Sequence, residues 1–227
     1  MLIAMPTAQD YGSAAADYLE KVIAEACNTK EKVCIALSGG STPLPILREL
    51  KERDLNWEQL HFFMVDERTV PLDDPESNFG AISEVFFNHI SSKCYSMVKE
   101  DKSTKEAIKN YESLMKDLMS FNTDGFPVFD LILLGMGDDG HTASLFPGTL
   151  ALEENNKIVV ENKVPQLGTT RITLTYPTII SAEKIVVLIK GESKKKIYNE
   201  IHSKAETRYP IHKIVLERED LIWITGD

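Results

Sequence analysis

The sequence has few cysteines, no long apolar run and no excess of basic residues. Its three cysteines, Cys27, Cys34 and Cys94, are an odd number without the spacing of metal ligands, which favours reduced thiols and a cytoplasmic protein. No stretch approaches the ~18 apolar residues of a membrane span, and the N-terminus lacks a basic segment followed by an apolar one. We therefore expect no membrane partner and read no targeting signal.

The charge of the chain argues against polyanionic partners. Its formal net charge is −10, whereas nucleic acids and anionic membranes select a basic face. We expect no nucleic-acid partner, and an anionic ligand would need a site that is locally basic. The 227 residues, 43% of them hydrophobic, suffice for one sizeable core, and we expect a single domain spanning 1–227. The oligomeric state is left open, a monomer being one option.

Short apolar runs alternate with amphipathic segments along the chain. The runs predict strands at 33–37, 61–65, 94–98 (an edge strand), 131–134, 157–160, 171–175, 185–189 and 221–225. The amphipathic segments predict helices at 13–26, from Pro43 to about 51 with Thr42 as N-cap, from Ser77 or Asn78 onward with Ile82, Val85 and Phe86 buried, at 103–119, and through Ile197 and Ile201. Such alternation predicts an α/β fold with a mainly parallel sheet.

The segment that follows the predicted strand 131–134 carries the residues best suited to acid–base catalysis. It turns through Gly135 and Gly137 and then presents Asp138, Asp139 and His141, at the edge where open α/β sheets bind ligands. Histidine exchanges protons near neutral pH, and a carboxylate two residues away can hold its tautomer. A lone histidine is more often structural, and Asp138 reads equally well as a solvated turn residue. The other four histidines are scattered along the chain.

A second segment, Ser38-Gly39-Gly40-Ser41-Thr42-Pro43, lies between a predicted strand and a predicted helix. Glycines let the backbone approach an anion, and hydroxyls with free N–H groups bind phosphate. The alternative is an ordinary strand-to-helix turn, since short glycine motifs are weak signals. The segment lacks the lysine of a nucleotide-binding P-loop.

Further charged residues lie at the ends of other predicted elements. Asp66 and Arg68 end a strand, and Glu67 between them is expected to face away from the site. Arg171 begins another strand, and Lys194 opens a run of three lysines after the strand 185–189. Each of these has a plain alternative as a surface charge or a structural ion pair.

Together these segments resemble the 6-phosphogluconolactonase family, the lactone hydrolases of the pentose phosphate pathway. The segment Gly135–Gly148 (GMGDDGHTASLFPG) resembles the signature loop of that family. Three more blocks match in the same order: Ser38–Pro43; Asp66-Glu67-Arg68 with Val70-Pro71 and Ser77-Asn78; and Arg171 with Gly191–Lys194. Four ordered blocks between residues 33 and 226 are a far stronger signal than one short motif.

The resemblance implies a three-layer α/β/α, Rossmann-like fold with a small additional layer, shared with glucosamine-6-phosphate deaminase. It implies hydrolysis of 6-phospho-D-glucono-1,5-lactone to 6-phosphogluconate without a cofactor or a metal. The implied substrate-binding residues are Gly39, Gly40, Ser41, Thr42, Asp66, Arg171 and Lys194, and the implied catalytic residues are His141, Asp139 and Arg68.

Three rival functions remain open at this point. A deaminase or isomerase of the same fold would carry a glutamate five positions beyond the loop histidine, where this chain has Phe146. A non-catalytic sugar-phosphate sensor would use the same scaffold, but no DNA-binding segment precedes the first predicted helix. Metal-assisted hydrolysis through Asp66, Asp139 and His141 is chemically possible because carboxylates and imidazole are common ligands.

Overall fold

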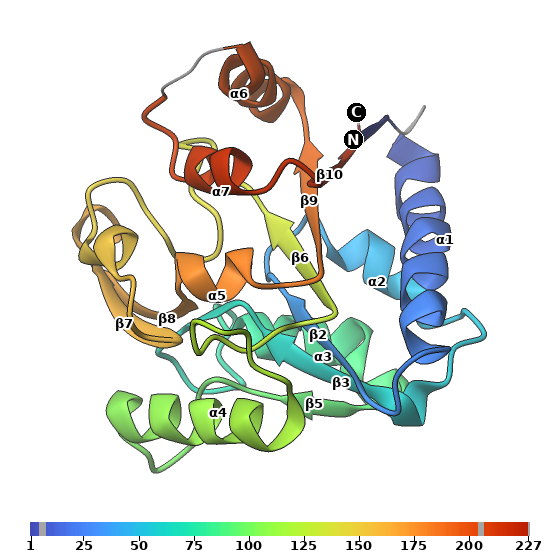
Figure 1. Ribbon diagram of the computed structural model, residues 1–227, viewed down its shortest axis with the longest axis horizontal. Coiled ribbons are helices and arrows are strands. Elements are labelled where there is room, and N and C mark those ends of the chain that lie inside the picture. The colour runs from blue at the N-terminus through green and yellow to red at the C-terminus, as the bar shows by residue number, and fades with distance from the viewer. Residues whose placement is uncertain (5–7, 204–206, 227) are drawn as a thin grey trace.

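Seven parallel strands form the central sheet of the computed structural model, which describes residues 1–4, 8–203 and 207–226 (Figure 1). Their order across the sheet is β1 (Leu2–Ala4), β10 (Ile222–Gly226), β9 (Lys184–Lys190), β6 (Leu131–Gly135), β2 (Val33–Leu37), β3 (Leu60–Met64) and β5 (Lys93–Tyr95). The inner strands are almost entirely buried, as expected for apolar strands covered on both faces. The predicted α/β fold with a mainly parallel sheet is confirmed.

Helices cover both faces of this sheet. They are α1 (Ala8–Cys27), α2 (Leu44–Leu50), α3 (Asn78–Val85), α4 (Thr104–Leu118), α5 (Tyr176–Ile180), α6 (Glu192–Ser203) and α7 (Ile211–Glu217). Short 3₁₀ turns occupy Trp57–Gln59, Phe87–His89, Leu150–Glu153 and Pro165–Leu167. Figure 1 shows α1 and α2 on one side of the sheet and α5 and α7 on the other. Across the described residues, no helix combines the length and the apolar character that crossing a membrane requires.

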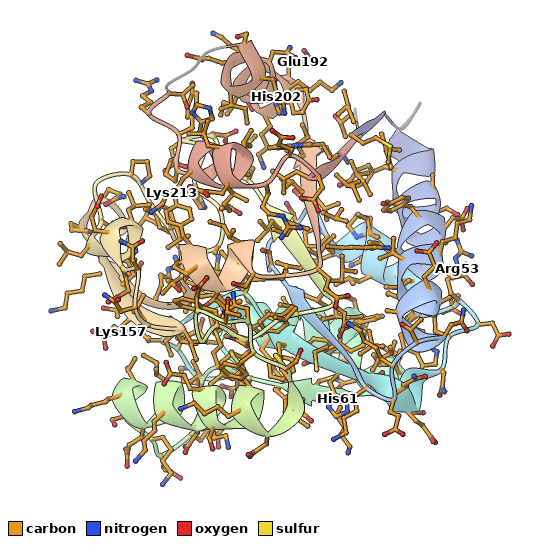
Figure 2. The ribbon with its side chains drawn as sticks, in the orientation of Figure 1. Arg53, His61, Lys157, Glu192, His202 and Lys213 are labelled. Carbon is orange, nitrogen blue, oxygen red and sulfur yellow. The ribbon has the colours of Figure 1, made fainter. Side chains whose placement is uncertain are left out.

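Each amphipathic helix buries one apolar stripe. On α4, Tyr111 and Met115 are buried, and burial of a large apolar side chain contributes about 1.5–3 kcal/mol. The N-terminus of α4 is fixed by a capping box between Ser103 and Glu106. Figure 2 shows charged side chains such as Arg53, Lys157 and Glu192 on the outside of the molecule.

A second sheet of three antiparallel strands lies beside the first. Its order is β4 (Asp66–Arg68), β8 (Thr169–Leu174) and β7 (Val159–Val164). The chain passes from one sheet to the other at Val65, whose N–H donates to the Leu37 carbonyl (2.9 Å) and whose own carbonyl accepts from the Leu174 N–H (2.9 Å). The small sheet therefore starts at the carboxyl end of β2. It is the additional layer that the family resemblance implied.

The predicted N-cap of α2 is wrong. The helix begins at Leu44, and Pro43 occupies the N-cap position without a side-chain hydrogen bond. Residues 41–43 form a turn, and the Thr42 side chain lines a cavity instead of folding back onto the helix. Proline at the start of a helix is compatible with this arrangement because its missing N–H leaves no intrahelical bond unmade.

Several other predicted boundaries are displaced. The strand predicted at 157–160 runs from Val159 to Val164, and the edge strand predicted at 94–98 is only Lys93–Tyr95. The first helix starts at Ala8 rather than at residue 13. In α3 and just beyond it, Ile82 and Phe86 are buried as predicted, whereas Val85 is only half-buried.

Candidate active site

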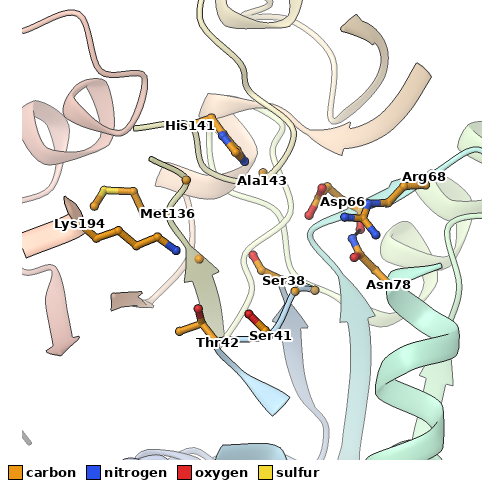
Figure 3. A pocket seen from close by; sticks show the side chains of 14 residues that line it. Ser38, Ser41, Thr42, Asp66, Arg68, Asn78, Met136, His141, Ala143 and Lys194 are labelled. Atoms are coloured by element: carbon orange, nitrogen blue, oxygen red, sulfur yellow. Dashed lines mark hydrogen bonds between the residues drawn. The ribbon is translucent and has the colours of Figure 1, made fainter. Parts of the chain in front are cut away.

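The strand order of the central sheet reverses between β2 and β6. From β2 the chain continues to β3 and β5 on one side, whereas β6 is followed by β9 and β10 on the other. The loops that leave β2 and β6 therefore diverge, and a crevice opens between them at the carboxyl edge of the sheet. A cavity of about 230 Å³ lies there (Figure 3). Of the predicted site residues, those that line it are Gly39, Gly40, Ser41, Thr42, Asp66, Arg68, His141 and Lys194.

The loop after β2 forms one wall of the cavity. Gly40 has a φ of 89°, a conformation that glycine adopts without strain, and a Cβ at Gly39 would overlap the Asn78 side chain. Figure 3 shows Ser41, Thr42 and the ammonium group of Lys194 on the same side of the cavity. Hydroxyls, close backbone N–H groups and an ammonium are the groups that bind phosphate in proteins. This side of the cavity can therefore hold a phosphate group.

Lys194 reaches the cavity from the first turn of α6. Its neighbour Ser193 donates a hydrogen bond from Oγ to Asp138 Oδ1 (2.8 Å), which ties the start of α6 to the loop after β6. The next residue, Lys195, lies 3.3 Å from the Glu192 carboxylate. Of the three consecutive lysines, Lys194 is the one that lines the cavity.

The loop after β6 places the His141 ring above the cavity. Its Nδ1 lies 2.5 Å from Asp139 Oδ1, which also accepts the His141 backbone N–H (3.1 Å). Phe146 stacks on the ring, with 4.0 Å between centroids and 27° between planes. Because a carboxylate only accepts hydrogen bonds, Nδ1 of the neutral ring carries the proton. Nε2 is then unprotonated, and the ring points into the cavity (Figure 3).

Glycines close the turn that carries this histidine. The Gly137 N–H donates to the His141 carbonyl (2.9 Å), and the Gly140 N–H donates to the Gly137 carbonyl (3.0 Å). Gly140 has a φ of 73°, and its carbonyl accepts from Ile211 N (3.0 Å) at the start of α7. A Cβ at Gly137 would overlap the His141 ring. The short distance between His141 and the backbone therefore depends on glycine.

Asp66 lies at the junction of the two sheets and lines the cavity. Ser144 donates to its Oδ2 at 2.6 Å. Burial raises the pKa of the Asp66 carboxyl, while the Ser144 hydrogen bond and the positive charges of Arg68 and Arg171 act in the opposite direction.

Two arginines lie side by side on adjacent strands of the small sheet. Arg68 of β4 and Arg171 of β8 are cross-strand partners, but only Arg68 lines the cavity. Arg68 donates from its guanidinium to the Glu76 carbonyl. Arg171 donates from Nε to Thr169 Oγ1 (3.2 Å), and burial, followed by the charge of Arg68, lowers the pKa of Arg171. The structure thus places Arg171 next to the cavity and Asp139 behind His141, with neither of them on the cavity wall.

Two polar residues outside the predicted set also line the cavity. The helix was expected to start at Ser77 or Asn78; Ser77 caps α3 by accepting from Gly80 N (3.0 Å), and the Asn78 amide donates to the Asp66 carbonyl (3.1 Å). Since a helix needs only one N-cap, the second polar residue of the pair was free for another role. Ser38, at the end of β2, contributes its hydroxyl to the cavity floor.

The chain matches the family "Glucosamine-6-phosphate isomerases/6-phosphogluconolactonase" over residues 6–223 and therefore belongs to it. Its curated relatives include the 6-phosphogluconolactonase of Chlamydia pneumoniae, 36% identical over 198 residues that cover 84% of this chain and 74% of that protein. The 6-phosphogluconolactonase of Haemophilus influenzae is 36% identical over 220 residues, 93% of this chain and 90% of that protein. The crystal structure of 6-phosphogluconolactonase from Thermotoga maritima superposes with a TM-score of 0.84 at 30% identity, covering 100% of this chain and 99% of that one. The family resemblance read from the four blocks is confirmed.

Glu67 organises the segment that presents Arg68 and Asn78. It is fully buried, does not line the cavity, and accepts hydrogen bonds from the backbone N–H groups of Arg68, Asn78 and Phe79 (each 2.7 Å) and from Ser77 Oγ (3.2 Å). Burial raises the pKa of the Glu67 carboxyl, and the hydrogen bonds from these backbone groups lower it. One buried side chain thus joins β4 to the start of α3.

We predict that Glu67→Ala destabilises the fold strongly. The substitution leaves three backbone N–H groups without their acceptor, and each unpaired buried group costs about 1–3 kcal/mol. The free energy of unfolding in urea should fall by about 3 kcal/mol or more. Glu84→Ala, at an exposed position on α3, is the matched control. Equal stability of the two variants would show that the Glu67 hydrogen bonds contribute little.

Proposed function

We propose that this protein hydrolyses 6-phospho-D-glucono-1,5-lactone to 6-phospho-D-gluconate, the second step of the oxidative pentose phosphate pathway. The observation that carries the proposal is that His141, oriented by Asp139, faces the same cavity as Ser41, Thr42 and Lys194. A base at one end and a phosphate-binding wall at the other fit a sugar-phosphate lactone. The names of the curated relatives and of the Thermotoga maritima structure support the same reaction.

In this mechanism His141 acts as the general base. As the oxygen of a water molecule bonds to C1, His141 Nε2 takes a proton from that water, and the π electrons of the C1 carbonyl move to its oxygen. When the tetrahedral intermediate collapses, the carbonyl re-forms, the bond from C1 to the ring oxygen breaks, and the imidazolium returns its proton to the ring oxygen. Asp139 stabilises the imidazolium between these steps. The acid product then loses a proton to solvent.

The remaining predicted residues bind and orient the substrate. Gly39, Gly40 and the neighbouring hydroxyls hold the phosphate with Lys194, so that a group remote from the reaction positions C1. Arg68 stabilises negative charge on the intermediate, and Asp66 accepts hydrogen bonds from sugar hydroxyls. Arg171, beside Arg68, adds positive charge close to the cavity.

Phe146 favours lactone hydrolysis over the isomerase chemistry of the same family. A deaminase of this fold would carry a glutamate at this position, which assists the loop histidine in opening a sugar ring. Here a phenyl ring stacks on His141 at 4.0 Å. A phenyl group carries no exchangeable proton, so ring opening would lack its second proton carrier.

We also propose a cytoplasmic location and a single domain. Cys27, Cys34 and Cys94 are free thiols, which fits a reducing compartment. Buried apolar side chains from the central sheet, the small sheet and the helices form one cluster, which supports one domain across 1–227. The chemistry requires no cofactor, and the partner we propose is the small-molecule lactone itself.

The function is tested by generating the lactone in situ and following its decay with and without protein. We expect faster decay with wild-type protein and a loss of about 10²–10⁴-fold in kcat for His141→Ala, because that is the usual contribution of general acid–base catalysis. KM should change little, since the phosphate contacts remain. His89→Ala, which removes an exposed histidine outside the cavity, should behave as wild type.

Two results would contradict this proposal. Equal decay of the lactone with and without wild-type protein would contradict the proposed activity. Ammonia release from glucosamine 6-phosphate at a rate rivalling lactone hydrolysis would contradict it as well. A folded His141→Ala protein with wild-type kcat, after subtraction of spontaneous hydrolysis, would move the base to Asp66 or Asp139.

The phosphate-binding role of Lys194 predicts a selective effect on KM. Lys194→Ala should raise KM about tenfold to hundredfold with little change in kcat, because a hydrogen bond to a charged group contributes about 1.5–3 kcal/mol in ground and transition states alike. Lys196→Ala, at an exposed position in the same lysine run, should leave KM unchanged. Gluconolactone without phosphate should be a poor substrate, and the same kcat/KM for both lactones would refute the phosphate site.

A further inference from the structure

The hydroxyl of Ser38 is buried at the cavity floor. Ser38 is only 5% exposed, and its Oγ has no hydrogen-bond partner among the residues that the structure describes. The residue itself is held firmly, because its backbone N–H donates to the Leu133 carbonyl (2.9 Å) and extends the pairing of β2 with β6. Figure 3 shows the hydroxyl pointing into the cavity.

A buried hydroxyl without a partner costs stability, so its persistence needs a reason. Within the described ranges 1–4, 8–203 and 207–226, four other buried side-chain atoms also lack a partner: Tyr11 Oη, Arg53 Nε, Arg68 Nε and Thr225 Oγ1. Of the five residues, Ser38 and Arg68 are the ones that line the cavity. Of these atoms, the Ser38 hydroxyl is the one that Figure 3 shows pointing into the cavity, and an unsatisfied donor there indicates a ligand atom that accepts its hydrogen bond.

The position of Ser38 indicates which atom that is. His141 lies on one side of the cavity, and Ser38 lies across from it (Figure 3). When His141 activates water, attack on C1 comes from the histidine side. As C1 becomes tetrahedral, its carbonyl oxygen moves away from the incoming water, toward the opposite wall, and gains negative charge. Donors placed where this charge develops stabilise the transition state more than the bound substrate.

We propose that Ser38 is a further catalytic residue, whose hydroxyl donates a hydrogen bond to the C1 oxyanion, while the guanidinium of Arg68 adds positive charge beside it. Ser38 keeps its proton throughout, and no bond to it forms or breaks. This inference rests on the proposed lactone hydrolysis and assigns one donor of its oxyanion site.

The test compares activity and stability in Ser38→Ala. The variant should lose about 10²–10³-fold in kcat, the usual effect of removing one oxyanion donor, with KM nearly unchanged. Its resistance to urea should equal or exceed that of wild type, because the lost hydroxyl has no partner among the described residues. Lower activity without lower stability separates a catalytic role from a structural one.

Two further variants sharpen the comparison. Thr225→Val also removes a buried hydroxyl that has no partner within the described residues, but Thr225 lies outside the cavity, so kcat should stay at the wild-type value. Ser38→Cys keeps nearly the same volume and offers only a weak donor, so its kcat should also fall, which provides a second reading if Ser38→Ala fails to fold.

Three results would overturn the assignment while wild-type protein hydrolyses the lactone. Wild-type kcat in Ser38→Ala or Ser38→Cys would show that the hydroxyl does not act in the reaction. A rise in KM alone would assign Ser38 to a sugar hydroxyl instead. An acyl adduct on Ser38, found by mass spectrometry of quenched wild-type reactions, would make it a nucleophile. Wild-type protein without lactonase activity would contradict the proposed function, and this inference with it.

Discussion

Parallel pairing of β2 with β3 on one side and β6 on the other forces the chain to leave the sheet in two directions. The loops after β2 and β6 therefore separate at the carboxyl edge and cannot fill the space between them. Both strands are buried and apolar, so the floor of this space is held by the core itself. The wall that we propose to bind phosphate and the ring of His141 can then lie on opposite sides of one cavity.

The small antiparallel sheet supports the other side of the cavity through satisfied hydrogen bonds. Ser144 donates from Oγ to Asp66 (2.6 Å) and from its backbone N–H to Thr173 Oγ1 (3.2 Å). The Asn162 amide donates to the Ser144 carbonyl (2.7 Å) and to Thr149 Oγ1 (3.0 Å). This network fixes the segment that stacks Phe146 against the histidine, and buried networks of this kind rigidify their surroundings. By contrast, the hydroxyl of Ser38 has no hydrogen-bond partner among the described residues.

The local residue pattern predicts an element correctly where that pattern alone decides its structure. Buried parallel strands are continuous apolar runs, so 33–37 was located to the residue, and residues at strand ends must meet at one edge of the sheet. The local pattern fails where tertiary contacts decide. The extent of β7 depends on its pairing with β8, which cannot be predicted from the mixed polar and apolar residues of β7 itself. The local pattern assigned Thr42 to a helix cap, and only the family resemblance indicated that it binds substrate. The unsatisfied state of Ser38 is likewise a property of packing.

We propose that Asp139, by accepting the Nδ1 proton of His141, leaves Nε2 free to accept a proton from water. The most direct test is NMR of protein with ¹⁵N-labelled histidine, with the His141 signals identified by their loss in His141→Ala. The ¹⁵N shifts of the neutral ring report which nitrogen carries the proton. We expect a protonated Nδ1 and an unprotonated Nε2. A protonated Nε2 with a bare Nδ1 would contradict it, since that tautomer cannot take a proton from water in the cavity.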